Sequence, residues 1–138
     1  MIITVPTEDW HFDFVDNDLK FVNKSVDFTR NAVSMSLFEG GQIYAIFGFV
    51  PIWDHVAETF LFPSPKIKQK ALGCIKRIKE NEDYALNHFG IKRFQSSIPY
   101  GNIGLKRWAD FLGYEEEGIM RYYGPNLEDH IRIAKIYD

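Results

Sequence analysis

The chain has 138 residues, a formal net charge of −3, a hydrophobic fraction of 46% and an aromatic fraction of 16%. Such a length fits one ordinary domain over residues 1–138, the apolar content excludes a disordered chain, and the charge argues against a nucleic-acid partner. A single cysteine excludes an intrachain disulfide, and the absence of a signal peptide or a membrane-spanning apolar run predicts a cytoplasmic protein without a membrane partner.

The amino-terminal part predicts a strand followed by a short helix. Ile2–Val5 is a β-branched run that ends at Pro6, as strands often do. Thr7 then precedes two acidic residues, which is a helix-start pattern because acids are favoured in the first turn. Leu19–Arg30 follows with apolar residues at roughly helical spacing, and its structure is left open.

The next segment predicts a β-hairpin and one further strand. Val33, Met35 and Leu37 alternate with Ser34, Ser36 and Phe38, and two glycines in the turn at 39–42 are free to take positive φ angles. Ile43–Val50 returns as an apolar strand that we expect Pro51 to end. Val56–Phe62 then reads as another strand.

A long amphipathic helix is expected next. Ser64 suits the N-cap and Pro65 the first helical position, while Gly90 suits the C-cap. Apolar side chains recur at spacings of three, four and seven residues, which predicts a face buried against a sheet. This stripe comprises Ile67, Ala71, Leu72, Ile75, Ile78, Ala85, Leu86 and Phe89.

The carboxyl-terminal part predicts a strand, a helix and two strands. Lys92–Tyr100 reads as a strand, and Asn102–Leu112 reads as a helix stopped by Gly113. Glu117–Tyr123 and His130–Tyr137 read as the last two strands. This order of elements predicts an α+β or mixed α/β layer fold.

The start of the long helix carries three lysines against the helix dipole. Lys66, Lys68 and Lys70 lie where the dipole favours acids by about 0.3–1 kcal/mol each. Backbone N–H groups at a helix start, together with lysines, form a natural phosphate site. The alternative is a solvated basic face, which the continuing charges at Lys76, Arg77 and Lys79 favour.

The order of elements and the residues of this loop resemble the GNAT superfamily of acetyl-CoA-dependent N-acetyltransferases. In that family an Arg/Gln-x-x-Gly-x-Gly/Ala loop holds the CoA pyrophosphate at a helix start. The matching run here is Leu61–Gly73, in which Lys68 replaces the usual Arg or Gln. Gln69 and Ala71 replace glycines and add Cβ atoms near the phosphate. Pro63 has no N–H to offer the pantetheine arm.

A second part of the resemblance lies in the last helix. The family often reads Asn-x-x-Ala-x-x-Leu-Tyr-x-x-x-Gly-Phe, and here Asn102, Gly113 and Tyr114 keep that spacing. The family's Asn commonly contacts the cofactor arm. Its Tyr commonly protonates the departing CoA thiolate, but here that position is Ala109, and the indole of Trp108 is too weak an acid. Possible substitutes are Tyr100, Tyr114, Tyr122 and Tyr123.

The resemblance implies a mostly antiparallel sheet of about seven strands flanked by helices, and transfer of an acetyl group from acetyl-CoA to a primary amine. It implies Glu58 as the base, directly or through water, although a solvent-facing Glu58 is the alternative. The implied cofactor-binding residues are Phe60, Leu61, Phe62, Lys68, Gln69, Lys70, Ala71, Leu72, Gly73, Asn102 and Trp108. A narrower likeness is to small GNAT-like proteins of tailed phages, which favours the alternative of a non-catalytic binding or structural protein.

Other candidate residues are weaker. The four histidines, His11, His55, His88 and His130, have no metal-binding spacing, so no metal is expected. Cys74 falls in or beside the helical stripe and suits packing better than nucleophilic catalysis. Asp54 and the run Glu115–Glu117 would attract a cationic amine, or would be solvated loop residues. Exposed edge strands would permit a homodimer.

Overall fold

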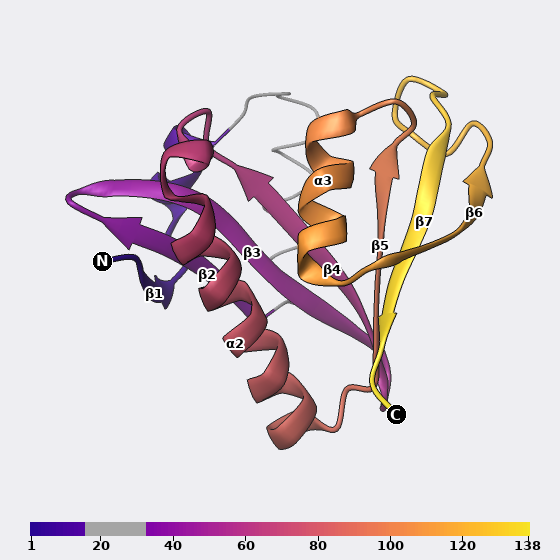
Figure 1. The fold of residues 1–138 in the computed structure, drawn as a ribbon, viewed down its shortest axis with the longest axis horizontal. Coiled ribbons are helices and arrows are strands. Elements are labelled where there is room, and N and C mark those ends of the chain that lie inside the picture. The colour runs from indigo at the N-terminus through magenta and orange to yellow at the C-terminus, as the bar shows by residue number, and fades with distance from the viewer. Residues whose placement is uncertain (16–32) are drawn as a thin grey trace.

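The computed structural model describes residues 1–15 and 33–138 and shows a seven-stranded sheet (Figure 1). The strand order is β1-β2-β3-β4-β5-β7-β6, and only β4 and β5 pair in parallel among these described strands. The strands are β1 (Ile3–Pro6), β2 (Val33–Glu39), β3 (Gln42–Trp53), β4 (Val56–Pro63), β5 (Arg93–Pro99), β6 (Glu115–Met120) and β7 (His130–Ile136). The predicted mixed, mostly antiparallel sheet flanked by helices is confirmed.

The two α-helices of residues 1–15 and 33–138 lie on one face of the sheet. Helix α2 (Ala71–Phe89) covers β2 and β3, and α3 (Ile103–Leu112) lies in front of β4 and β5 (Figure 1). The helices end at Gly90 and Gly113, both of which take positive φ angles, as predicted for C-caps. The 3₁₀ helix η1 (Asp9–Phe14) packs on the other face, where Phe12 joins Ile43 and Ile46.

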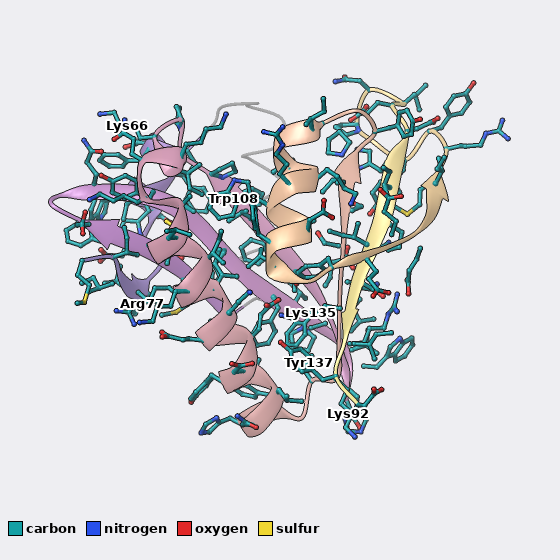
Figure 2. The ribbon with its side chains drawn as sticks, viewed as in Figure 1. Lys66, Arg77, Lys92, Trp108, Lys135 and Tyr137 are labelled. Atoms are coloured by element: carbon teal, nitrogen blue, oxygen red, sulfur yellow. The ribbon has the colours of Figure 1, made fainter. Side chains whose placement is uncertain are left out.

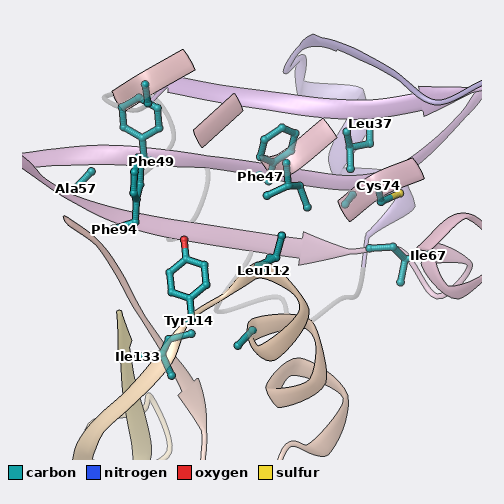
Figure 3. Packing of buried hydrophobic residues seen from close by; sticks show 14 of the residues in the cluster. Leu37, Phe47, Phe49, Ala57, Ile67, Cys74, Phe94, Leu112, Tyr114 and Ile133 are labelled. Carbon is teal, nitrogen blue, oxygen red and sulfur yellow. The ribbon is translucent and has the colours of Figure 1, made fainter. Parts of the chain in front are cut away.

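The main core lies between the sheet and the two α-helices (Figure 3). Leu37, Phe47 and Phe94 supply it from three strands, while Cys74 and Leu112 supply it from the two helices. Inward side chains alternate along the strands, as expected for a sheet with packed faces. The core therefore fixes α2 and α3 relative to β4 and β5, the pair of strands on which the site depends.

Two predicted strand boundaries are wrong. Pro51 does not end its strand, because β3 continues to Trp53 and Pro51 lies opposite Ala57 beside a register irregularity. A proline is tolerated there since the irregular ladder does not need its missing N–H. The sixth strand covers Glu115–Met120 rather than Glu117–Tyr123, because Gly118 allows a bulge that brings the acidic residues into the ladder.

The predicted start of the long helix is also wrong. Ser64 does not cap an α-helix, because its Oγ accepts a hydrogen bond from the N–H of Lys66 within a turn, at 3.0 Å. A 3₁₀ helix, η2 (Ile67–Lys70), follows, and α2 begins only at Ala71. Leu72 is 84% exposed, so the buried stripe is narrower than predicted.

The predicted short amino-terminal helix is present as the 3₁₀ helix η1. It is capped by Glu8 and His11 rather than by Thr7. The hydroxyl of Thr7 instead contacts the Oγ atoms of Ser34 and Ser36, at 2.8 and 3.1 Å, which ties this segment to β2. The expectation for Leu19–Arg30 lies outside the described residues.

Candidate functional site

The two parallel strands, β4 and β5, pair over a short ladder and then separate. Val56 pairs with Arg93, and the ladder ends at Glu58 and Gln95. Beyond this point β4 continues beside β3 and β5 continues beside β7, so the sheet opens into a V with α3 in front of it (Figure 1). Two strands that separate no longer use each other as hydrogen-bond partners, which makes this opening a place where an extended polar ligand can pair.

Two side chains link the strands one step beyond the ladder. The Oγ of Ser96 donates to the carbonyl oxygen of Thr59 at 2.9 Å, and the Oγ1 of Thr59 donates to the carbonyl oxygen of Gln95 at 3.2 Å. We call Thr59, Gln95 and Ser96 the apex of the V. These bonds fix where the strands part and place one hydroxyl of β4 at that point.

The end of β4 presents its predicted cofactor residues on two faces. Leu61 packs with the core on the side of the α-helices. Phe60 and Phe62 lie on the opposite face, where their rings stack with centroids 5.3 Å apart. This alternation follows from the period of two in a strand. A ligand lying between the strands would therefore meet Leu61 on one side and the two phenylalanine rings on the other.

The basic residues at the start of α2 differ in their ionic partners. Lys70 binds the carboxylate of Glu39 at 2.7 Å. The side chains of Lys66 and Lys68 are exposed and form no ion pair with any residue in 1–15 or 33–138. Figure 2 shows Lys66 beside the start of α2. Lys66 and Lys68 are therefore available to bind an anion, while the charge of Lys70 is already balanced by Glu39.

Several amides just before α2 already donate hydrogen bonds, either to β3 or within the loop. The N–H groups of Ser64 and Ile67 donate to backbone carbonyls at 2.9 and 3.1 Å, and that of Gln69 donates to Lys66 at 3.0 Å. Pro63 and Pro65 have no N–H to offer. An anion would therefore bind one turn later, where α2 begins and the positive end of its dipole lies.

Gly73, the last glycine of the family-like loop, has a packing role here. A Cβ at this position would lie 3.2 Å from Cγ1 of Ile2, which is tighter than most real contacts. The glycine therefore allows β1 to approach α2 closely. This contact explains the glycine without a ligand.

The predicted site residues of α3 differ in their burial and their contacts. Asn102 caps the helix, since its Oδ1 accepts the N–H of Leu105 at 3.1 Å, which stabilises a helix by about 1 kcal/mol. Trp108 is half-buried and points towards α2 (Figure 2). Ala109 is buried in the core, where its methyl group has no proton to donate.

Glu58 is part of a polar row on the face opposite the α-helices. Its two carboxylate oxygens accept hydrogen bonds from Nη1 of Arg132 at 3.0 and 3.1 Å, and Oε2 also accepts one from Nε2 of Gln95 at 3.0 Å. Arg93 continues the row, donating to Oε1 of Gln95 at 2.9 Å and pairing with Glu117. Glu58 is therefore held in place by partners from β5 and β7 and is not a solvent-facing residue.

A second polar group is buried on the side of the α-helices. Glu82 of α2 is only 5% exposed, and its Oε2 accepts a hydrogen bond from the hydroxyl of Tyr114 at 2.6 Å. Nζ of Lys135 lies 3.3 Å from Oε1 of Glu82. The hydroxyl of Tyr114 also lies 3.2 Å from Oγ1 of Thr59, so this group reaches the apex (Figure 3 shows the ring of Tyr114 pointing towards β4).

Burial dominates the electrostatics of this group. Loss of solvent raises the pKa of Glu82, although hydrogen bonds from Tyr114 and the charge of Lys135 act in the opposite direction. Burial also raises the pKa of Tyr114 well above its ordinary value, and the neighbouring Glu82 carboxylate adds to this rise. Both groups therefore hold their protons more firmly than they would in water.

The sequence analysis did not find Glu82, Lys135, Thr59 or Arg132. Glu82 had a usable signal, because it falls between Ile78 and Ala85 in the periodic stripe that faces the sheet. A charged residue at a buried helical position needs a partner. Its partners could not be read from the sequence, since Tyr114 and Lys135 are 32 and 53 residues away.

The histidines are explained by local contacts. Nδ1 of His11 lies 2.8 Å from Oγ of Ser36, and His55 and His88 each contact a backbone carbonyl oxygen at 3.0 Å. Nδ1 of His130 is buried and has no hydrogen-bond partner among the described residues. Residues 1–15 and 33–138 contain no His, Cys, Asp and Glu cluster that could hold a metal, and no helix there is long and apolar enough to cross a membrane.

Several solved structures share this fold. The IAA acetyltransferase from Bacillus cereus ATCC 14579 superposes with a TM-score of 0.75 at 11% identity, covering 99% of each chain. A GNAT family acetyltransferase from Elizabethkingia anophelis with acetyl-CoA bound gives 0.74 at 10% identity, covering 99% of this chain and 98% of the other. Spermidine N-acetyltransferase from Vibrio cholerae in complex with CoA and spermine gives 0.72 at 10% identity, covering 98% and 95%.

These likenesses establish the fold. The chain has the GNAT fold, with the seven-stranded sheet and flanking helices found in these acetyltransferases. No protein-family profile matches the sequence, and no curated protein matches it. At identities of 10–12% the fold is shared, while individual side chains must be judged from their own contacts.

Proposed function

We propose that the protein is an N-acetyltransferase that uses acetyl-CoA and acts on a primary amine. The observation that carries this proposal is the V between β4 and β5, joined by a helix whose start is basic. An extended ligand with amides at one end and phosphates at the other matches that arrangement. Structures of the same fold with acetyl-CoA bound, and with CoA and spermine bound, support the same ligand class.

The residues present fit such a ligand at both ends of the V. The pyrophosphate would rest on the backbone from Lys68 to Gly73, where α2 begins, with the exposed ammonium groups of Lys66 and Lys68 alongside. The pantetheine arm would lie between the strands, against Leu61 and Trp108. Asn102 keeps its side-chain amide N–H groups for the arm, because only its oxygen is used in capping.

The remaining proposed contacts come from the same two segments. The arm would pass Phe60 and Phe62 at the end of β4, and the phosphates would pass Gln69, Lys70, Ala71 and Leu72 at the start of α2. Acetyl-CoA would supply the acetyl group as a thioester. The protein would position it and receive the proton that the amine releases.

Glu58 is the proposed base, acting through water. Three of its hydrogen-bond sites are filled by Arg132 and Gln95, which leaves about one lone pair of the carboxylate for a water molecule. Arg132 and Gln95 thereby hold the carboxylate in place.

Calorimetric titration with acetyl-CoA tests the proposal. We expect saturable binding, with affinity falling as salt rises because Lys66 and Lys68 contact phosphate. Desulfo-CoA should bind comparably, since it carries the same phosphates and pantetheine arm. An absence of both heat and thermal shift at millimolar acetyl-CoA would exclude the enzyme. Turnover on a panel of primary amines, lost in Glu58→Gln, would complete the case.

The second candidate is a non-catalytic binding or structural protein of the same fold, of the kind that phages encode. A hollow of about 720 Å³ favours it, because exposed apolar side chains line this surface at the end of the β3–β4 hairpin. Ile52, Trp53 and Phe89 belong to it. Ala109, which has no proton to donate, and Pro63, which has no N–H for a pantetheine arm, also favour the non-catalytic candidate. Acetyl-CoA binding without turnover on any amine would favour this candidate.

A cytoplasmic location and a homodimer are further parts of the proposal. The edge strands β1 and β6 each leave one side of their ladder without a strand partner among the described residues, which would allow pairing between two copies. Sedimentation or light scattering of the purified protein would test the dimer.

A further inference from the structure

The apex of the V carries a hydroxyl that connects to a buried source of protons. Oγ1 of Thr59 lies at the point where β4 leaves β5, and it is 3.2 Å from the hydroxyl of Tyr114. That hydroxyl contacts Glu82 at 2.6 Å, and Lys135 lies 3.3 Å beyond. Four groups that carry or accept protons therefore form one chain from the partly exposed Lys135 to the apex.

An acetyl transfer from a thioester ends with a sulfur atom that needs a proton. Ala109 offers none, and its methyl group is buried in the core. Three other tyrosines, Tyr100, Tyr122 and Tyr123, are exposed and lie at the end of the sheet. Tyr114 differs from them, because its hydroxyl is fixed next to the strand that would lie along the thioester.

We propose that Thr59 gives a proton to the departing CoA sulfur, and that Tyr114, Glu82 and Lys135 replace it. This inference rests on the proposed function. As the carbon–nitrogen bond forms and the carbon–sulfur bond breaks, the electron pair of the latter goes to sulfur. In one concerted step the hydroxyl of Thr59 turns from the carbonyl oxygen of Gln95 and gives its proton to sulfur while Thr59 takes the proton of Tyr114, so that no free threonine alkoxide forms.

The remaining protons balance along the chain. Tyr114 regains its proton from Glu82 when that carboxyl is protonated, and otherwise Lys135 supplies one through Glu82. Lys135 is 18% exposed and can recover a proton from water. The amine loses one proton on the side of Glu58 and the sulfur gains one at the apex, so the protein returns to its starting state. Thr59 is the catalytic residue here, while Tyr114 and Glu82 act through it.

Thr59→Val and Tyr114→Phe remove single hydroxyl groups while keeping the shape of the side chain. Each should lower kcat by about 100-fold, the order of effect expected for proton transfer in catalysis. The double variant should be no slower than either single variant, because the two residues serve one step. The matched control is Tyr84→Phe, which removes a hydroxyl from an exposed ring stacked on His88 and should change kcat by less than about threefold.

An acetyl donor with a more acidic thiol separates proton donation from a structural effect. Acetyl thioesters of thiophenols leave as stable thiolates and need little protonation. With such a donor, both variants should recover to within about fivefold of the natural protein. An equal loss with both donors would show that the hydroxyl groups only support the fold, and would overturn the inference.

Titration of the thiol of bound CoA provides a readout that does not depend on turnover. The ultraviolet absorbance of the thiolate gives the pKa of this thiol. A hydroxyl donor at the apex should lower that pKa in the natural protein relative to Thr59→Val and Tyr114→Phe. Equal pKa values in all three proteins would overturn the inference while leaving the acetyltransferase proposal intact. If no protein binds CoA, then both proposals fail.

Discussion

The two ends of the V hold lysines in opposite settings. At the start of α2, Lys66 and Lys68 are exposed and have no ionic partner in the described part of the chain. Behind the apex, in the group that contacts Thr59 through Tyr114, Lys135 is largely buried and faces the carboxylate of Glu82. Removing the charge of Lys66 or Lys68 should not disturb the fold, whereas removing the charge of Lys135 should destabilise it. Binding and stability should therefore respond to different lysines.

This difference also separates what the fold requires from what a ligand requires. The buried carboxylate of Glu82 is unstable without its partners, so the fold itself requires Tyr114 and Lys135 beside it. Exposed lysines against a helix dipole do not stabilise the fold, which leaves the proposed binding of an anion as their role. The following substitutions test the contrast, from the largest expected effect to the smallest.

Lys135→Met should lower the free energy of unfolding by about 3 kcal/mol at pH 7, because it leaves the buried carboxylate of Glu82 without its counter-charge. Urea unfolding measures this effect. The matched control is Lys106→Met, which removes an exposed ammonium paired with Asp110 and should change stability little. Equal losses of stability in the two variants would contradict a special contribution of the buried pair of Lys135 and Glu82.

The loss in Lys135→Met should shrink as the pH falls. Burial raises the pKa of Glu82 in the folded state above its ordinary value in the unfolded chain, so the folded protein binds more protons than the unfolded chain between those two pKa values. The free energy of unfolding therefore falls as the pH rises through this window and recovers as it is lowered. The groups facing Glu82 are Tyr114, Lys135 and Asp83, and Asp83 raises the pKa further. Urea unfolding at pH 7 and pH 5 measures this recovery.

Tyr114→Phe should lower the free energy of unfolding by about 1–2 kcal/mol, since Glu82 loses one buried hydrogen bond while the ring stays in the core. Urea unfolding again provides the measurement. Tyr137→Phe serves as the control because its hydroxyl lies at the more open end of the same group. A loss below about 0.5 kcal/mol would indicate that Glu82 is already protonated and has other partners.

Lys66→Gln and Lys68→Gln should leave stability unchanged and weaken acetyl-CoA binding by about three- to tenfold each, with a smaller dependence on salt. Calorimetric titration at two salt concentrations measures both effects. Lys79→Gln is the matched control, because Lys79 is also exposed but lies more than two turns further along α2. An equal effect of Lys79→Gln would show that the positive charge of the whole helix attracts acetyl-CoA, and that Lys66 and Lys68 make no specific contact.

Cys74 should be unreactive in the folded protein. Burial raises the pKa of its thiol to about 11, so little thiolate forms at pH 8 and reagents cannot reach the sulfur. Alkylation with iodoacetamide should be slow in buffer and fast in denaturant. Rapid modification of the folded protein would show that α2 opens away from the sheet.

Local patterns were enough to predict most of the fold. Alternation identified the β2–β3 hairpin, and Gly90 and Gly113 marked the ends of both α-helices. The start of α2 was missed because Ser64 and Pro65 look like a helix cap, whereas the hydroxyl of Ser64 closes a turn two residues on. Competition between a cap and a turn depends on how the segment packs, and a sequence window does not contain that information.

The site was predicted at its basic end and missed at its apex. Lys66 and Lys68 are informative by themselves, because their charge opposes the helix dipole. The apex was missed because it depends on contacts of Thr59, Tyr114 and Glu82. These contacts form only when β4, α2 and the segment after α3 meet, and those segments are far apart in the sequence. The predicted roles of Glu58, Asn102 and the cofactor-binding residues stay predictions.

A crystal structure of the protein grown with CoA tests the central claim most directly. The account predicts density for the pantetheine arm between β4 and β5, for the pyrophosphate at the start of α2 beside Lys66 and Lys68, and for the sulfur within reach of Oγ1 of Thr59. A V filled by protein side chains, or CoA bound only in the hollow lined by Trp53 and Phe89, would contradict it.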